Sequence, residues 1–433
     1  MLLIVCAGVV LASLDLFIVN VALPPIARDL RVSDLSELSW ILNGYAIVYA
    51  ALLVFSGRLA DRYRRDRAFL LGVAVFTVAS AACAGSTSVG MLVGFRVVQA
   101  AGAALLTPTS LSLVLAAYEP ERRQGAVRAW TAVGGLAAAI GPVIGGVLVS
   151  ASWRWVFLVN VPIGIAAVLV GWRRLPEVAG HPIERPDPLG VVLGTAGVGL
   201  LSFGRHGRSP LVQPELFRSR DFTGASLVAL FFSAAFGAML LSIVLWEQGA
   251  WGWSALRTGL TLAPGPLMVP IVSFGVAGRL IRRYGPAAVI ILGSAIFAVG
   301  RVWWALAVSD SPDYLSGVLG GMILGGVGVG LTLPTMMGAG TASLPPNRFA
   351  TGSAVITMIR QTGLALGVAV LVAVLGTGAA HHTPALAAFR HGWWLTAVLC
   401  AAGIAPALAL RRRRLRADVV APVMTVAPAS EGA

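Results

Sequence analysis

The chain has 433 residues, of which 57% are hydrophobic and 12% are charged, and its mean hydropathy is +0.85. A soluble domain of this size cannot bury so much apolar surface, so the composition predicts a membrane protein that crosses the bilayer many times. The formal net charge of +14 comes from arginine alone, because the sequence contains no lysine. Most of these arginines lie between apolar runs, which indicates a topology signal rather than a nucleic-acid-binding patch.

The first half of the chain, residues 1–172, is expected to form a bundle of six spanning helices. An apolar run of about 20 residues is long enough, at about 1.5 Å per residue, to span the roughly 30 Å hydrocarbon core. Pro24 and Pro25 are expected to end the first of these helices. The six predicted helices are residues 2–23, 40–56, 68–84, 91–118, 129–150 and 155–171.

A short apolar segment, residues 188–203, lies within a polar linker, residues 173–221. It has 16 residues and four glycines, which is a poor composition for a spanning helix. Arginines flank it on both sides, and basic segments stay in the cytoplasm. We therefore expect it to lie on the cytoplasmic interface or to dip in and return. The alternative is that it spans the bilayer and a neighbouring helix does not.

The second half, residues 222–410, is expected to form another six-helix bundle, followed by a disordered cytoplasmic tail, residues 411–433. The predicted fold class is an all-α polytopic membrane protein with 12 spanning helices in two pseudo-symmetric bundles. Both termini are expected in the cytoplasm. The helices predicted for the second half are residues 222–246, 258–276, 286–308, 314–337, 350–375 and 393–410.

A basic segment after the second predicted helix, residues 57–67, holds five arginines in eleven residues, which orients the protein because such a segment stays inside the cell. The pattern Gly-Arg-Leu-x-x-Arg-Tyr that begins at Gly57 returns at Gly278, an offset of 221 residues, and this repeat indicates two related halves. Asp61 is either a gate residue that pairs with the second half or a solvated acid that balances Arg62 and Arg65.

Asp15 is the one acidic residue that lies deep inside a predicted helix. A carboxylate at such a depth is costly unless it is paired or faces water, so it is a candidate functional group. Arg96, in the fourth predicted helix, lies at a similar depth and is its natural partner. An arginine favours the ionised carboxylate and dehydration favours the protonated one, so the pair could load and release a proton. The alternative is a structural ion pair that orients two helices.

Several motifs, in chain order, resemble those of the major facilitator superfamily, and in particular its drug:proton antiporter family that usually has fourteen helices. The resemblance covers nearly the whole chain. Arg64 and Ala100 stand where that pattern usually has glycine, and the centre of the chain is shorter. The motif residues fall in six groups: Leu14 to Pro24; Gly57, Asp61, Arg62 and Arg65; Arg96 to Gly102; Gly134, Gly141, Pro142, Gly145 and Gly146; Trp153 to Gly164; and Arg360 to Ala369.

This resemblance implies a secondary transporter that exports a small lipophilic drug, antibiotic or metabolite in exchange for protons, by alternating access between two bundles. The Gly141-Pro142 motif is then a seam that stays sealed while the bundles rock, although glycine-rich packing alone could explain it. Two other readings stay open: a proton-coupled nutrient symporter, and a transport-inactive sensor of the same fold. The expected partners are the substrate, protons and the lipid bilayer of the cytoplasmic membrane, with no nucleic acid and a monomeric state.

Four further residues are candidates for the wall of a substrate cavity: Asn20, Gln99, Arg360 and Gln361. Arg360 could bind substrate or move charge, or it could pair with backbone carbonyls, as we expect for Arg301. Glu247 is expected to be a solvated residue at an outer helix end. We find no nucleophile–base pair, metal-ligand cluster or phosphate-binding loop, so the sequence predicts neither an enzyme nor a cofactor, and the proton gradient is the expected energy source.

Overall fold

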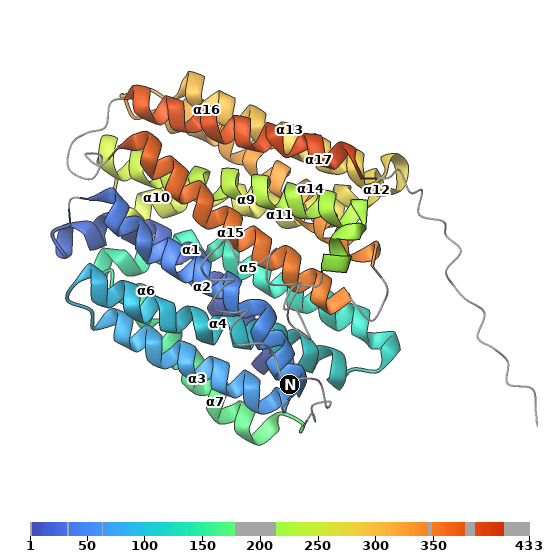
Figure 1. The fold of residues 1–433 in the computed structure, drawn as a ribbon. Helices are drawn as coiled ribbons and strands as arrows, with labels where there is room; N and C mark the ends of the chain where they lie inside the picture. The colour runs from blue at the N-terminus through green and yellow to red at the C-terminus, as the bar shows by residue number, and fades with distance from the viewer. Residues whose placement is uncertain are drawn as a thin grey trace, which may run out of the picture.

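The computed structural model describes residues 2–32, 34–62, 64–177, 214–344, 349–376 and 386–410. These residues form two helical bundles that lie side by side (Figure 1). Ten of the described helical segments are long and apolar enough to cross a membrane. Two more helices, α2 and α5, have 28 and 32 residues and run beside them. The segment 188–203 and the tail 411–433 lie outside the described residues.

The first bundle contains the helices of the first half of the chain. Two short helices, α6 and α7, together make its last span. The bounds are α1 Leu2–Asp29, α2 Leu35–Arg62, α3 Arg65–Ala84, α4 Val89–Ala117, α5 Pro120–Ala151, α6 Trp155–Leu158 and α7 Asn160–Arg174.

The second bundle is more interrupted, because three of its spans contain π-helical turns. The bounds are η2 Pro214–Arg218, α9 Arg220–Leu245, η3 Trp246–Ala250, α10 Ala255–Leu262, α11 Pro264–Val272, η4 Ser273–Ala277, α12 Gly278–Tyr284, α13 Pro286–Ala307, η5 Tyr314–Leu319, α14 Gly320–Ala342, α15 Phe349–Leu375, α16 Leu386–Ala402 and α17 Ile404–Leu408.

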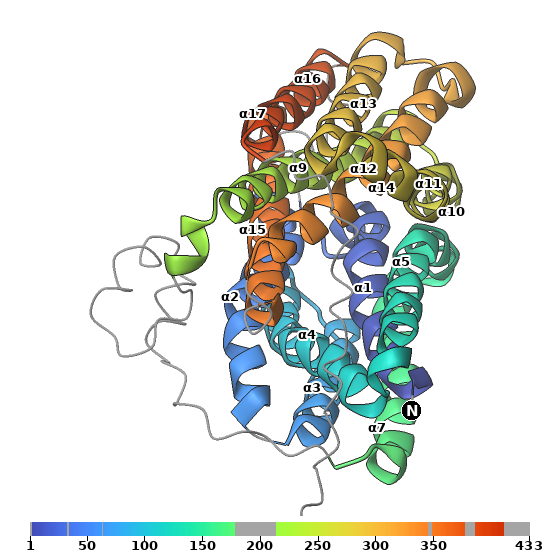
Figure 2. The same cartoon turned by 90° about the vertical axis from the view of Figure 1, so that its right-hand side faces the viewer.

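The two bundles repeat the same set of helix contacts. In the first, α1 packs on α5, α4 and α7, while α3 packs on α4 and α7, and α2 on α4. In the second, α9 packs on α15, α14 and α16, while α13 packs on α14 and α16, and α11 on α14. The bundles meet along two matching pairs, α2 with α15 and α5 with α10 and α11 (Figure 2). This correspondence agrees with the internal repeat in the sequence.

The basic repeats lie at one end of the molecule, where α2 and α12 terminate, and we call it the basic end (Figure 1). One apolar cluster joins both bundles toward the opposite end, with Ile18 and Trp246 among its members. Toward the basic end the apolar clusters are mostly separate, one built around Phe69 and another around Phe222. The bundles are therefore closed against each other at the opposite end.

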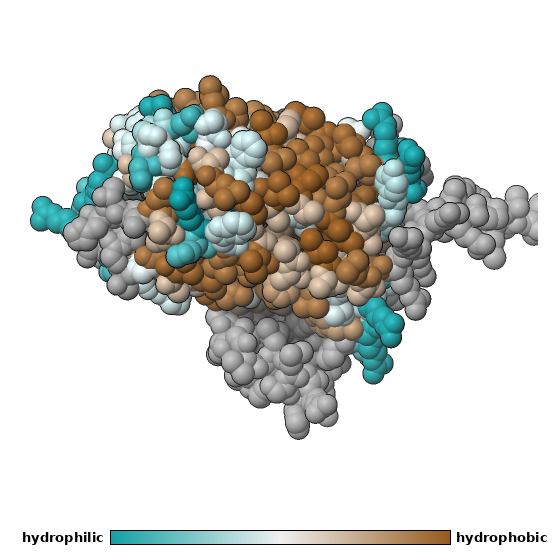
Figure 3. All heavy atoms as spheres, turned by 90° about the horizontal axis from the view of Figure 1, so that it is seen from above, coloured by the Kyte–Doolittle hydropathy of each residue, from teal (hydrophilic) through white to brown (hydrophobic). Residues whose placement is uncertain are grey.

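The outer surface of the bundles is apolar between two polar ends. Figure 3 shows one face on which hydrophobic side chains form a broad zone, with hydrophilic side chains at its two ends. Large hydrophobic residues of α13 and α16 are strongly exposed, among them Val299, Leu306 and Val398. An exposed apolar zone of this size matches lipid contact rather than contact with water.

Several helix boundaries differ from the sequence-based expectation. Pro24 and Pro25 do not end α1, which continues to Asp29. A proline lacks an N–H and frees the carbonyl four residues before it, which for Pro25 is that of Val21. The side chain of Gln248, from the second bundle, donates to this carbonyl at 3.1 Å, so the freed acceptor joins the bundles at the opposite end. The predicted loop 119–128 is helical from Pro120 onward.

The chain leaves the first bundle and enters the second at the basic end. Glu177, just after α7, forms an ion pair with Arg64, which lies in the connection between α2 and α3. Ser219, just before α9, bonds to Ser343 at the end of α14. Both described ends of this connection therefore lie at the basic end, and the expectation that residues 188–203 do not span the bilayer stays a prediction.

Single cysteines at Gly180 and Ser209 test this topology, in a variant whose three native cysteines are replaced by serine. We expect a membrane-impermeant maleimide to label both positions only from the cytoplasmic side of oriented vesicles. Labelling of one position from the other side would show that residues 188–203 cross the bilayer.

Candidate functional site

A buried ion pair lies at the centre of the first bundle. Asp15, midway along α1, is fully buried, and Arg96 of α4 is 1% exposed. Nη1 of Arg96 donates to Oδ2 of Asp15. The contact that the sequence predicts between the two residues is therefore present. A buried charge pair of this kind is stable only when further hydrogen bonds satisfy both partners.

The second carboxylate oxygen of Asp15 also has donors. Nε2 of Gln99 lies 2.9 Å from Oδ1 of Asp15, and Nδ2 of Asn160 lies 3.4 Å from it. Gln99 and Asn160 both also donate to Oγ of Ser80. Four helices, α1, α3, α4 and α7, thus converge on one carboxyl group. Because every partner at the carboxyl oxygens donates a proton, the arrangement suits an ionised carboxylate.

The guanidinium of Arg96 is held from several sides. Its Nε donates to the carbonyl oxygen of Ile41 at 3.3 Å, and Nη1 donates to Gln99 at 2.6 Å. The ring of Tyr45 lies under it, with 4.1 Å from Cζ to the ring centroid. Such a cation–π contact stabilises a desolvated cation by about 2 kcal/mol. Arg96 is thus fixed in a position from which it reaches both Asp15 and the space between the bundles.

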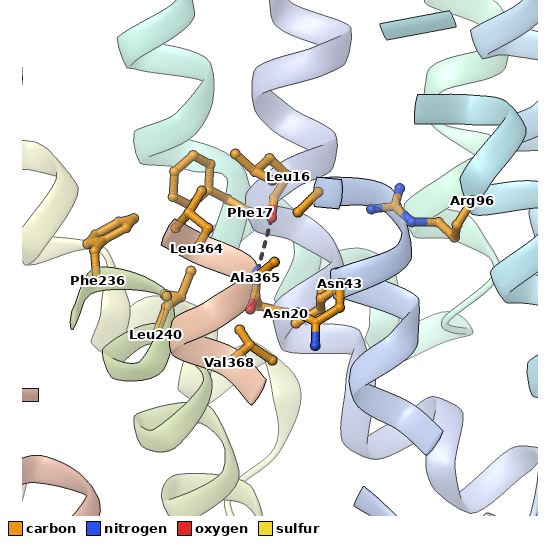
Figure 4. Close-up of a pocket in the computed structure, with 13 residues that line it drawn as sticks. Leu16, Phe17, Asn20, Asn43, Arg96, Phe236, Leu240, Leu364, Ala365 and Val368 are labelled. Atoms are coloured by element: carbon orange, nitrogen blue, oxygen red, sulfur yellow. Dashed lines mark hydrogen bonds between the residues drawn. The ribbon is translucent and has the colours of Figure 1, made fainter. Parts of the chain in front are cut away.

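A small cavity lies between the bundles and brings α1, α2 and α4 of the first next to α9 and α15 of the second (Figure 4). Arg96 forms part of its wall, so the ion pair borders the cavity. The other lining residues are mostly apolar: Leu16, Phe17, Asn20, Leu42, Asn43, Ala46, Phe236, Gly237, Leu240, Leu364, Ala365 and Val368.

The four residues predicted to line a cavity divide into three groups. Asn20 lines it, with its side-chain amide donating to the carbonyl of Leu16. Gln99 does not line this cavity, because it is fully buried in the Asp15 network. Arg360 and Gln361 lie about one turn before Leu364 in α15, next to the cavity residues of that helix.

The basic motif that the sequence places in a loop is largely helical. Gly57, Asp61 and Arg62 belong to the last turns of α2, and Arg65 begins α3. Arg64, which stands where the resemblance expects glycine, forms ion pairs with Asp66 and Glu177. The residue that departs from the motif therefore connects α2, α3 and the chain after α7. The gate role proposed for Asp61 stays a prediction.

The glycines of the Gly141-Pro142 motif lie at two different contacts of α5. A Cβ atom on Gly145 would lie 2.8 Å from Ile18 of α1, and one on Gly134 would lie 2.7 Å from Val9. These two positions pack α5 inside the first bundle. On the other face, a Cβ on Gly146 would lie 2.6 Å from the carbonyl oxygen of Ala255, and one on Gly259 would lie 2.3 Å from that of Pro142. The motif therefore also lies at a seam between the bundles.

Glu247 was misread from the sequence as a solvated residue, since the structure buries it completely. The helix continues through the π-helical turn η3, and α10 folds back over it. Oε2 of Glu247 lies 2.6 Å from the hydroxyl oxygen of Thr261, and that hydroxyl also lies 2.8 Å from the carbonyl oxygen of Thr258. The Thr261 hydroxyl is the donor and Oε2 of Glu247 the acceptor, so an uncharged side chain holds this buried carboxyl group.

Glu247→Gln keeps a side-chain oxygen that can accept the hydrogen bond from Thr261, and it has no ionisable group. We expect the melting temperature of the Gln variant to stay close to that of the unaltered protein. Glu247→Ala leaves the Thr261 hydroxyl without this partner and should lower the free energy of unfolding by roughly 1–3 kcal/mol. Thermal unfolding followed by tryptophan fluorescence measures both, with Thr261→Val as the partner control. A large loss of stability in the Gln variant would mean that the site requires an ionised carboxylate.

Arg301 has the structural role that the sequence predicts. It is fully buried in α13, Nη2 donates to the carbonyl oxygen of Gly321 at 2.5 Å, and Cζ lies 3.7 Å from the centroid of the Trp304 ring. These contacts hold a cation inside the second bundle without a carboxylate among the described residues.

Comparison with known proteins gives one consistent family. Residues 5–368 match the family model described as Major Facilitator Superfamily. The chain is 33% identical over 428 residues to the cephamycin export protein CmcT of Amycolatopsis lactamdurans, a match that covers 90% of this chain and 87% of the relative. It is 30% identical to the methylenomycin A resistance protein of Bacillus subtilis (strain 168), covering 90% of each chain. It is 29% identical to the tetracenomycin C resistance and export protein of Streptomyces glaucescens, a match that covers 99% of this chain and 94% of the relative.

Solved structures show the same fold at low sequence identity. A bacterial homologue of the human lysosomal transporter Spinster, in an inward-facing and occupied conformation, superposes with a TM-score of 0.72 at 18% identity, over 95% of this chain and 96% of that one. The nucleoside transporter NupG superposes with a TM-score of 0.70 at 11% identity, over 95% of this chain and 100% of that one.

Proposed function

This chain belongs to the Major Facilitator Superfamily, and we propose that it exports a small lipophilic drug, antibiotic or metabolite in exchange for protons. Three of its relatives are named for export of, or resistance to, antibiotics. The observation that carries the proposal is the Asp15–Arg96 pair, in which a buried carboxyl group contacts an arginine in the wall of a cavity between the two bundles. A buried carboxyl group beside a substrate cavity can couple proton binding to substrate binding.

The coupling follows from the geometry of Arg96, which touches Asp15 on one side and the cavity on the other. In the conformation seen here, closed at the opposite end, every partner of the Asp15 carboxyl oxygens among the described residues is a hydrogen-bond donor, which suits the carboxylate form. The ion pair holds Arg96 at the cavity wall, where it can contribute to a substrate site. A proton that binds to Asp15 removes the charge that holds Arg96 there, so protonation weakens substrate binding, and bound substrate in turn disfavours protonation. Proton uptake is therefore coupled to substrate release, and both belong to the conformation open at the opposite end.

The proposed orientation places the basic end in the cytoplasm of the cell, with the protein in the cytoplasmic membrane. The support is the concentration of arginine at that end, in residues 57–67 and 278–285, since positively charged segments stay inside. The conformation seen here would then be closed to the outside and ready to receive substrate from the cytoplasm. We further propose that the protein acts as a monomer without a cofactor.

Expression in a bacterial strain that lacks its own drug pumps tests the function. We expect the protein to raise the inhibitory concentration of some members of a panel of lipophilic antibiotics, and to lower their accumulation in cells. A proton uncoupler should abolish both effects. Uptake of a nutrient, without any resistance, would favour the symporter reading instead.

A further inference from the structure

One cation at the contact between the bundles has no anionic partner among the residues that the structure describes. Arg360 lies in α15, which packs along α2 of the first bundle. It is half-buried, none of the ion pairs among the described residues includes it, and its Nε has no hydrogen-bond acceptor there. Arg96 is paired with Asp15, and Arg301 donates to a carbonyl oxygen and lies over a tryptophan ring. Among these three arginines, Arg360 is the one without a carboxylate or carbonyl partner in the described part of the chain.

The position of Arg360 places this charge beside the cavity. Leu364 is one helical turn after it in α15 and lines the cavity, so both residues lie on one face of that helix. Tyr49 lies in α2, the helix that packs along α15, and it follows Ala46, another lining residue, by three positions. The phenol of Tyr49 donates to the hydroxyl oxygen of Thr107 at 3.1 Å, which leaves its own oxygen available as an acceptor but supplies no negative charge.

The rest of the cavity is suited to an apolar body. Phe17, Phe236, Leu240, Leu364 and Val368 point into it from both bundles (Figure 4). Asp15, the carboxylate that borders the cavity among the described residues, is already paired with Arg96. The region between the bundles therefore combines an apolar chamber with one uncompensated positive charge. A cationic guest would meet repulsion there, whereas an anionic guest would supply the missing counter-charge and form charge-assisted hydrogen bonds.

We propose that Arg360 binds the acidic group of an amphiphilic, singly negative substrate, an aromatic carboxylate or an ionised phenol, whose apolar body fills the cavity lined by Phe17 and Phe236. This proposal rests on the export function proposed above and names its substrate class. A guanidinium matches a carboxylate better than an ammonium does, because it presents two parallel donors in one plane. Exchange of such an anion for an incoming proton moves two charges per cycle, both in the direction that an inside-negative potential favours.

Three probes with one naphthalene ring separate charge from apolar contact: 2-naphthoate, its methyl ester and 2-naphthylmethylammonium. Isothermal titration calorimetry on the purified full-length protein in lipid nanodiscs measures each Kd. We expect the unaltered protein to bind the carboxylate most tightly and the ammonium least. Arg360→Gln should weaken binding of the carboxylate by roughly 10- to 100-fold, as a lost charged hydrogen bond requires, and change binding of the ester by less than about twofold.

Two further variants complete the test. Arg360→Lys retains the charge without the planar donor pair and should give an intermediate affinity for the carboxylate. Arg257→Gln removes an exposed arginine near the opposite end and should leave the Kd of each of the three probes unchanged. Thermal unfolding shows that each variant is folded, and the Lys variant tests the proposal even where the Gln variant is unstable.

The proposal is overturned when Arg360→Gln or Arg360→Lys binds the carboxylate like the unaltered protein, when the ester and the carboxylate lose affinity equally, or when the unaltered protein shows no preference for the anion. These measurements involve no transport. If the carboxylate binds through Arg360 but the protein exports nothing, the proposed function is contradicted and the anion site is not. If the protein exports substrates but binds the three probes without regard to their charge, the anion site is contradicted and the proposed function is not.

Discussion

Asp15→Asn is expected to abolish export driven by a pH gradient. An amide cannot take up and release a proton in this range, so the one buried carboxyl group beside the cavity would no longer titrate. Transport in everted membrane vesicles, energised by an imposed pH gradient, should fall to the level of vesicles without the protein. Asp15→Glu keeps the acid and should retain part of the activity.

The Asn variant also leaves Arg96 buried without its counter-charge, which costs about 3–5 kcal/mol of stability. The double variant Asp15→Asn with Arg96→Gln removes both charges and should recover most of that stability, because no isolated charge remains. We expect it to fold and yet to stay inactive. Recovery of pH-driven export in the double variant would mean that the pair is structural, and that another group carries the proton.

Gly146→Val is expected to hold the bundles apart at the opposite end. The new Cβ would lie 2.6 Å from the carbonyl oxygen of Ala255 and 2.7 Å from Cα of Leu256, and these backbone atoms cannot rotate away. Inserting bulk into a close contact costs roughly 1–3 kcal/mol, or about a 5- to 150-fold shift in population against the closed conformation. Export should be largely lost while expression is retained.

Labelling of a single cysteine at Thr258, a fully buried residue of α10, measures this opening. In the background without native cysteines, Gly146→Val should speed its reaction with an impermeant maleimide added from outside. Gly338→Val is the matched control, since that glycine is exposed and has no atom within 4 Å of an added Cβ. Equal effects of the two valines, or loss of expression with Gly146→Val, would favour a purely structural role for the motif.

The features that the sequence predicts well are those set by charge and apolar length. Long apolar runs locate most of the spanning helices, and the repeat at Gly57 and Gly278 indicates two related bundles, both of which the structure confirms. The contact of Asp15 with Arg96 is predictable because few charged residues lie deep in apolar helices, and burial requires that they be paired.

The partners of that ion pair are harder to predict. Gln99, Ser80 and Asn160 are uncharged polar residues, and such residues occur in most helices of this chain without any signal in their spacing. Whether they meet depends on the rotation of three helices, which is set by packing. Gln99 illustrates this, because a rotation of α4 decides between the cavity and the ion pair.

Glu247 and Pro25 were misread for a related reason. A glutamate beside a tryptophan at the end of an apolar run resembles an interfacial residue, and only the return of α10 buries it. A proline pair normally ends a helix, but here a side chain of the second bundle satisfies the freed carbonyl of Val21. A contact within the second bundle accounts for Glu247 and a contact between the bundles for Pro25, and neither contact can be read from the local segment alone.

Proton movement in proteoliposomes tests the central claim most directly. The purified protein is reconstituted with a pH-sensitive dye inside the vesicles, the exterior is made acidic, and a substrate identified by the resistance panel is loaded inside. We expect substrate efflux together with substrate-dependent acidification of the interior, and neither in vesicles that contain Asp15→Asn. Substrate efflux without proton entry, or equal proton entry in the Asn variant, would contradict proton-coupled export through Asp15.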